Sequence, residues 1–207
     1  MKRSLVVIAV LGLFAGVAQA NLLLNESFES GTGQGGSLDS ATVDNWTFWG
    51  GGWWANDSGA VYDGTWAIKR WDDGTGMYQD FTASADTSYD FSLFAYDGSS
   101  EPLVDRRVDL RVEWYDGTDT KIGDTVVVDS FGAGTVDSYT ELSGVTTSPA
   151  STSYGRFLIT TESDGASPGG SVFYDAASVD ATVIPEPALA GLVLVGIGMV
   201  RMLRRRS

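Results

Sequence analysis

Hydrophobic and polar residues alternate in short runs through the middle of the chain, from residue 21 to about residue 183. The run Arg107–Tyr115 carries Val, Leu, Val and Trp at every second position, and Ser88–Tyr96 carries Tyr, Phe, Leu and Ala in the same way. Such a period of two is typical of strands with one buried face. Further strands are expected at Leu22–Leu24, Ser27–Glu29, Trp46–Trp49, Trp66–Arg70, Met77–Thr82, Thr125–Asp129, Arg156–Thr161, Val172–Tyr174 and Ser178–Val183.

Turn signals separate these runs, and no part of the middle shows a helical apolar period of useful length. Asp-Gly tolerates the positive φ angles of tight turns between antiparallel strands. About ten short strands separated by turn signals predict an all-β domain, an antiparallel β-sandwich. The Asp-Gly pairs are Asp63-Gly64, Asp73-Gly74, Asp97-Gly98, Asp116-Gly117 and Asp164-Gly165.

The first twenty residues have the order of a secretory signal peptide. Lys2 and Arg3 precede the apolar segment Leu5–Val17, and Ala18-Gln19-Ala20 supplies a small-x-small cleavage site. We therefore expect residues 1–20 to be removed by signal peptidase. An N-terminal membrane-spanning helix is the alternative, but the segment is short for one.

The last residues, 184–207, have three parts in a fixed order. A stiff Pro185-Glu186-Pro187 precedes the apolar run Ala188–Val200, and a basic end carries Arg201, Arg204, Arg205 and Arg206. Arginines at one end of an apolar run favour the cytoplasmic side of a membrane. Thirteen residues of helix span only about 20 Å, against roughly 30 Å of hydrocarbon, so the run is short for a permanent anchor.

This three-part tail resembles the PEP-CTERM sorting signal of bacterial surface proteins. The resemblance implies recognition by an exosortase, cleavage near Pro185-Glu186-Pro187, and delivery to the cell surface or extracellular matrix. The alternative is an ordinary C-terminal membrane anchor. Either way the tail is expected to enter a membrane with its arginines inside and the domain at 21–183 outside.

The composition of segment 21–183 excludes several classes of function. It holds seven of the 13 basic residues and 26 of the 27 acidic residues, a formal charge of −19. Such a surface repels nucleic acid and anionic lipid headgroups. The chain has no histidine and no cysteine, which removes Ser-His-Asp and Cys-His chemistry and histidine-ligated metals. A metal would need oxygen ligands, which suits calcium.

The two ends of this domain resemble those of jelly-roll carbohydrate-binding modules attached to xylanases and other glycanases, a galactose-binding-like sandwich. The resemblance implies a jelly roll whose first and last strands lie side by side and, in many members, a structural calcium; carried over, Glu29 and Asp175 would be its ligands. The matching residues are Asn21, Leu22, Leu23, Asn25, Phe28 and Glu29 at the start, and Phe173, Tyr174 and Asp175 at the end.

The residues themselves give the calcium some support. Two carboxylates brought together by pairing of the first and last strands repel each other unless a cation lies between them. The alternative is that Glu29 and Asp175 are merely solvated acids at strand ends, in a chain that has many acids.

Six of the seven tryptophans fall within Asn45–Trp71. Sugar rings stack their apolar faces on aromatic rings, and their hydroxyls bond to nearby carboxylates and amides. The chain offers these at Asn56, Asp57, Asp72 and Asp73. A sandwich without disulfides also needs bulky core residues, so some of these tryptophans must be internal. We expect Trp46, Trp66 and Trp114 in the core. The candidate carbohydrate-binding residues are Trp49, Trp53, Trp54 and Trp71.

These features predict an exported, surface-sorted β-sandwich that binds polysaccharide, such as matrix exopolysaccharide, without catalysis. One rival is a structural or adhesive matrix protein that has no sugar site. The other is a small glycoside hydrolase, which needs only two carboxylates. Because the chain has many carboxylates, the choice of any one pair is no evidence for a hydrolase.

Overall fold

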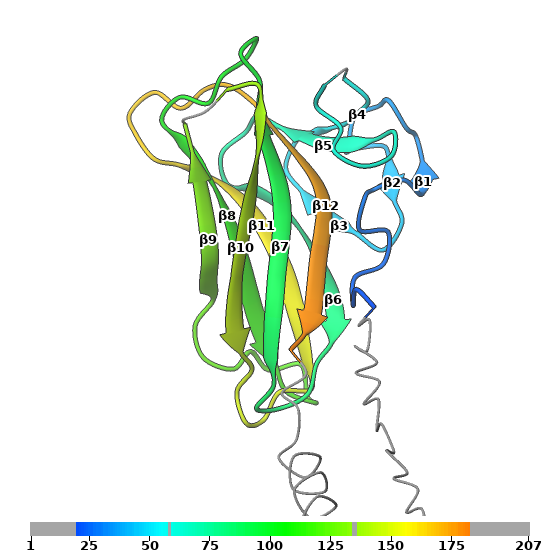
Figure 1. Ribbon diagram of the computed structural model, residues 1–207, viewed down its shortest axis with the longest axis vertical. Coiled ribbons are helices and arrows are strands. Elements are labelled where there is room, and N and C mark those ends of the chain that lie inside the picture. Colours follow the sequence, from blue (N-terminus) through cyan, green and yellow to red (C-terminus); the bar gives the residue numbers. More distant parts are fainter. Residues whose placement is uncertain (1–19, 58, 134–135, 183–207) are drawn as a thin grey trace, which may run out of the picture.

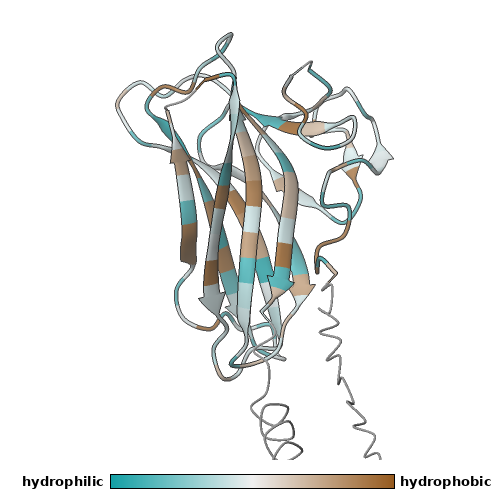
Figure 2. Ribbon diagram, in the orientation of Figure 1, coloured by the Kyte–Doolittle hydropathy of each residue, from teal (hydrophilic) through white to brown (hydrophobic). Residues whose placement is uncertain are grey.

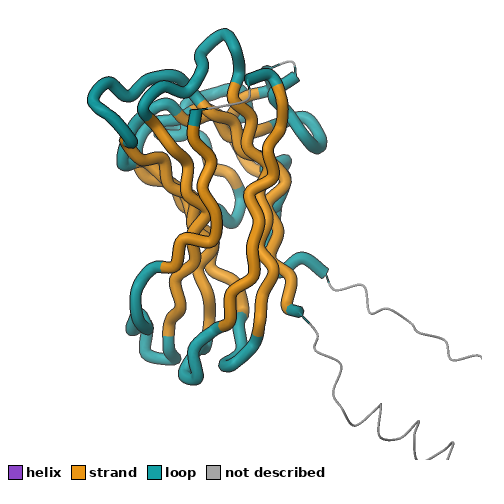
Figure 3. Tube along the Cα trace, turned by 60° about the vertical axis from the view of Figure 1, so that its left-hand side comes forward, coloured by secondary structure: helices purple, strands orange, loops and turns teal. Residues whose placement is uncertain are grey.

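The computed structural model describes residues 20–57, 59–133 and 136–182. The predicted sorting tail at 184–207 and the predicted signal peptide at 1–20, apart from Ala20, lie outside these residues. Every described residue belongs to a strand, turn or loop, as Figure 3 shows. Across this part of the chain no helix is long and apolar enough to cross a membrane.

Two five-stranded antiparallel sheets face each other, which confirms the predicted β-sandwich (Figure 1). The first sheet has the strand order β10-β7-β12-β5-β4, with β10 at Ser138–Thr147, β7 at Ser88–Asp97, β12 at Val172–Ala181, β5 at Ala67–Arg70 and β4 at Trp53–Ala55. The second has the order β3-β6-β11-β8-β9, with β3 at Thr47–Trp49, β6 at Thr75–Thr82, β11 at Tyr154–Ser163, β8 at Arg106–Tyr115 and β9 at Val126–Gly132. A small ribbon pairs β1, Gly31–Thr32, with β2, Thr42–Val43.

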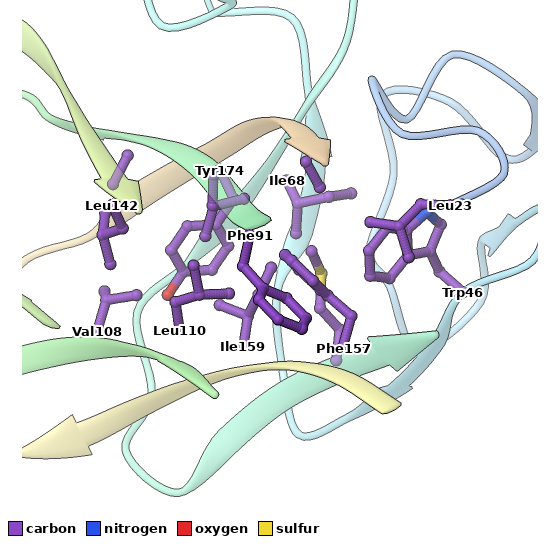
Figure 4. Close-up of a cluster of buried hydrophobic side chains, with 14 of the residues drawn as sticks. Leu23, Trp46, Ile68, Phe91, Val108, Leu110, Leu142, Phe157, Ile159 and Tyr174 are labelled. Atoms are coloured by element: carbon purple, nitrogen blue, oxygen red, sulfur yellow. The ribbon is translucent and has the colours of Figure 1, made fainter. Parts of the chain in front are cut away.

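Alternation along the long strands builds the core between the sheets. Val108, Leu110, Val112 and Trp114 of β8 are all buried, as their period of two predicts. Figure 2 shows hydrophobic and hydrophilic residues alternating along the long strands. Figure 4 shows the interdigitated side chains, with Phe91 of β7 facing residues of the opposite sheet. The ring of Phe91 lies 6.3 Å from that of Phe157 on β11.

The expected core tryptophans are found mostly as predicted. Trp46 and Trp114 are buried in the main cluster, whereas Trp66 is half-buried and packs against that cluster. Trp46 fills the gap beside β11, with its ring 5.1 Å from Phe28 and 6.0 Å from Phe157.

The two strands expected at Leu22–Leu24 and Ser27–Glu29 do not form, and this prediction is wrong. Asn25 and Phe28 have φ values of 53° and 58°, so the backbone turns twice where a strand would be straight. The segment still lies beside the last strand, because Leu22 N donates to Val179 O at 2.8 Å. Conversely, β10 was not expected, since Leu142 is its one buried hydrophobic residue.

Both ends of the described chain lie at the same end of the sandwich (Figure 1). From there β12 runs back about 30 Å to its start at Val172, given roughly 3.4 Å per residue. The loops between β7 and β8 and between β11 and β12 lie at that distant end.

Candidate functional site

A groove of about 970 Å³ opens at the end of the sandwich away from the chain ends. Strands β4 and β5 form one wall, and the loops at 98–105 and 164–170 form the rest. Aromatic and apolar side chains meet charged ones along its lining. These are Trp53, Trp71, Pro102, Val104 and Pro168, together with Asp57, Lys69, Asp72, Glu101 and Arg106.

Trp53 stands on the outer side of β4 because strand alternation sends its neighbour inward. The side chain of Trp53 is 42% exposed, whereas Trp54 is 0% exposed. Gly52 before them packs tightly, since a Cβ there would lie 2.6 Å from Leu38 Cδ1 and 2.8 Å from Arg70 Cδ. A larger residue at this position would therefore clash, and the alternation along β4 places Trp53 toward the groove and Trp54 toward the core.

The prediction that Trp54 contacts a sugar is wrong. Its indole N–H donates to Phe28 O at 2.8 Å, and its ring lies 5.9 Å from that of Trp66. A fully buried ring has no face left for a ligand, so Trp54 belongs to the core.

The other three candidates divide between two surfaces. Trp71 follows β5 and lines the groove together with Trp53. Neither ring stacks on another aromatic ring among the described residues, so neither face is taken by such a partner. Trp49 is 37% exposed but lies on β3 of the other sheet, where its ring covers Gly76. Its Nε1 donates to Gly74 O at 2.9 Å.

Ion pairs hold the rim of the groove in place. Lys69 Nζ lies 3.0 Å from Glu101 Oε2 and 3.9 Å from Asp57 Oδ2. Hydrogen bonds from Lys69 and then Ser171 lower the pKa of Glu101. These contacts tie the 98–105 loop to both β5 and the start of β12.

Arg106 fixes the opposite rim in a similar way. Its Nε donates to Asp73 Oδ1 at 2.8 Å, and its Nη1 donates to Gly170 O at 2.6 Å. The start of β8 is thereby linked both to the turn that precedes β6 and to the 164–170 loop.

A buried arginine supports the groove from below. Arg70 on β5 is 0% exposed and donates to three carbonyls, those of Trp49, Gly50 and Gly76, at 2.6, 3.2 and 2.8 Å. Burial lowers the pKa of its guanidinium. Because β5 belongs to the first sheet and Trp49 and Gly76 to the second, Arg70 joins the sheets beneath the segment that leads into Trp53.

The predicted metal ligands, Glu29 and Asp175, both accept hydrogen bonds from the backbone of the same loop, residues 62–66. Glu29 Oε1 accepts from the backbone N–H groups of Thr65 and Trp66 at 2.9 and 2.8 Å. Asp175 Oδ2 accepts from those of Tyr62 and Asp63 at 2.7 and 3.0 Å.

Burial raises the pKa of Asp175 to about 6, although the three backbone N–H donors around it oppose the shift. Calcium takes six to eight oxygen ligands. The described residues bring no third acidic side chain into a group that could hold a metal. The contacts of the two carboxylates thus give them a role that needs no cation, and calcium stays a prediction.

An aromatic row on the outer face of the second sheet was not predicted. Arg156 on β11 lies between Tyr78 and Tyr115, 4.0 and 5.0 Å from the ring centroids, and binds Asp80 through Nε at 2.7 Å. Tyr154 stacks on Tyr115 at 4.8 Å. The residues come from three strands, and only the register of β11 against β6 and β8 brings them together. Their ring faces are largely taken by one another, unlike that of Trp53.

No protein-family model and no curated protein sequence matches this chain. Solved structures share its sandwich fold. The CBM22-1–GH10 modules of Clostridium thermocellum endo-1,4-β-D-xylanase 10B, complexed with xylohexaose, match with a TM-score of 0.51 and 16% identity, over 68% of this chain and 27% of that one. TmCBM61 in complex with β-1,4-galactotriose matches with a TM-score of 0.52 and 17% identity, over 79% of this chain and 99% of that one.

A third match is the enzymatically active domain of tailspike protein 4 of bacteriophage CBA120, with a TM-score of 0.54 and 11% identity over 78% of this chain. This chain spans about a quarter of the xylanase and about a fifth of the tailspike chain. At such identities the similarity establishes the fold, which is that of carbohydrate-binding modules among others, and not a shared ligand.

Proposed function

We propose that this protein is a non-catalytic polysaccharide-binding protein whose ligand lies in the groove, against Trp53 and Trp71. The observation that carries the proposal is the open ring of Trp53 in a large groove with carboxylates along its rim. A pyranose ring can stack its C–H face on an indole, while its hydroxyls donate to the carboxylates of Asp57, Asp72 and Glu101. The fold it shares with sugar-complexed modules supports the same conclusion.

A hydrolase is less well supported by the groove. Glycoside hydrolysis needs one carboxylic acid that is still protonated at the working pH. Glu101 has the opposite property, since Lys69 and Ser171 lower its pKa.

The proposal extends to where the protein works. The signal peptide and the PEP-CTERM-like tail would export the chain and sort it to the cell surface or extracellular matrix. The groove lies at the end of the sandwich away from Thr182, which precedes the tail. An anchored or freshly released domain would therefore present the groove outward.

Affinity electrophoresis in gels containing xylan or β-1,4-galactan tests the proposal. Retardation should be strongly reduced by Trp53→Ala and reduced by Trp71→Ala. Trp49→Ala is the matched control, because it removes an exposed tryptophan outside the groove. Retardation lost in Trp49→Ala and kept in Trp53→Ala would move the site to the second sheet, at Trp49 on β3.

The rival functions give different results in the same assay. An absence of retardation on every glycan would favour a structural or adhesive matrix protein. Release of reducing sugar from either polymer would favour a hydrolase.

A further inference from the structure

Both cations in the groove are already engaged. Lys69 has a side chain only 19% exposed, and its ammonium lies against Glu101 and Asp57. The side chain of Arg106 is 6% exposed and is held by Asp73 and by a backbone carbonyl. Each cation is therefore already paired with at least one carboxylate, which offsets its attraction for an anionic ligand.

The carboxylates, in contrast, are open to a ligand. The side chains of Asp57 and Glu101 are 58% and 56% exposed. Asp72 is exposed as well and forms no ion pair with any described residue. A sugar hydroxyl can donate to such an oxygen, whereas a carboxylate or sulfate on the sugar would be repelled at the same place.

The rest of the domain offers an anion no better place. All seven basic residues of segment 21–183 are engaged in the structure. Six form ion pairs, and Arg70 is buried against three carbonyls. The formal charge of −19 therefore reflects acidic residues for which the segment has no further basic partner.

We propose that the groove selects glycans by charge, so that it binds uncharged chains and excludes chains that carry carboxylates or sulfates. This inference rests on the proposed function and adds the class of ligand. Exclusion arises locally, from Asp57, Asp72 and Glu101 around the tryptophans, in addition to the repulsion of the whole domain.

The test compares polymers that share a backbone but differ in charge. Titration calorimetry with the intact domain would measure β-1,4-galactan against the same galactan oxidised at C6, and xylan against glucuronoxylan. We expect each acidic polymer to bind at least about tenfold more weakly than its neutral counterpart.

Two double variants locate the effect. Asp57→Asn with Asp72→Asn removes two charges from the groove, so the ratio of neutral to acidic affinity, both measured on that variant, should fall several-fold even though its neutral binding is itself weakened. Asp90→Asn with Asp180→Asn removes two charges from the outer face of the first sheet, far from the groove, and should leave most of the penalty.

Three results would overturn the inference. Equal affinity for neutral and acidic polymers would refute charge selection while leaving the proposed function standing. An equal loss of the penalty in both double variants would show that net charge, and not the groove, rejects anions. No binding of any polymer, neutral or acidic, would refute the proposed function and this inference with it.

Discussion

Because Asp175 is buried, we predict that its contribution to the stability of the metal-free protein increases as the pH falls from neutrality. The carboxylate is buried at the bulge of β12, and burial raises its pKa from the ordinary 3.8 to about 6. The unfolded chain ionises at the lower pH, so between about pH 4 and pH 6 ionisation favours unfolding. In the folded protein the carboxyl is protonated below its pKa of about 6, and its contribution to stability is complete once the pH lies below the unfolded value of 3.8.

The size of the effect follows from the two pKa values. A shift of about two units corresponds to about 3 kcal/mol, at 1.36 kcal/mol per unit. For a domain of this length that is roughly 6 to 12 °C in Tm. The contribution of Asp175 to the free energy of unfolding should therefore fall by about this amount from about pH 4 to pH 7.

Urea unfolding of the 21–183 domain in chelator, at a series of pH values, measures this directly. Other acids also titrate, so the relevant quantity is the difference between the native chain and Asp175→Asn. The variant should lack most of the pH dependence. Asp44→Asn, which changes an exposed acid, is the matched control and should retain it.

A difference curve that is flat between pH 4 and pH 7 would refute the reasoning about Asp175. The same experiment in calcium tests the predicted metal, since calcium binds the ionised carboxylate. If Glu29 and Asp175 hold calcium, adding it should raise stability near pH 7 and reverse the slope. If the melting curve is the same in calcium and in chelator, the two carboxylates serve only to hold the loop.

Three further predictions concern other parts of the chain. Gly76→Ala should destabilise the fold by roughly 1 to 3 kcal/mol in urea unfolding, because its Cβ would meet the Trp49 ring and Ile159 O; an unchanged midpoint would contradict the packing of Trp49. Arg70→Met should cost roughly 3 kcal/mol and weaken polysaccharide binding, since three buried carbonyls lose their donor, and full affinity would show that the groove does not depend on it. The intact mass of surface-extracted protein should match a chain without Arg204–Arg206. A mass that includes these residues would indicate that the tail is a simple membrane anchor.

The sequence predicted the fold where one face of a strand is buried. The alternation in β7 and β8 is regular because each faces the opposite sheet along its whole length. β10 carries one buried hydrophobic residue and shows no such period, so its place beside β7 depends on pairing that sequence does not reveal. The segment 22–29 is apolar enough for strands, but two left-handed residues turn it into a coil.

The site was predictable only in part, for a related reason. Clustering in sequence pointed to the tryptophans, and two of them, Trp53 and Trp71, line the groove. Whether Trp53 or Trp54 is exposed depends on which side of a three-residue strand it occupies. Trp53 and Trp54 are neighbours with opposite environments. The rim residues Glu101 and Arg106 come from the β7–β8 loop and from the start of β8, far from Trp53 in sequence. No local pattern in the sequence links them to Trp53.

The central claim is that sugar binds in the groove, and calorimetric titration of the 21–183 domain with galactan or xylan oligosaccharides tests it most directly. Loss of one stacking ring should cost about 1 to 3 kcal/mol, or roughly five- to 150-fold in Kd. The account predicts that loss for Trp53→Ala and affinity within about twofold of the native domain for Trp49→Ala. Equal affinity of the native domain and Trp53→Ala would contradict it.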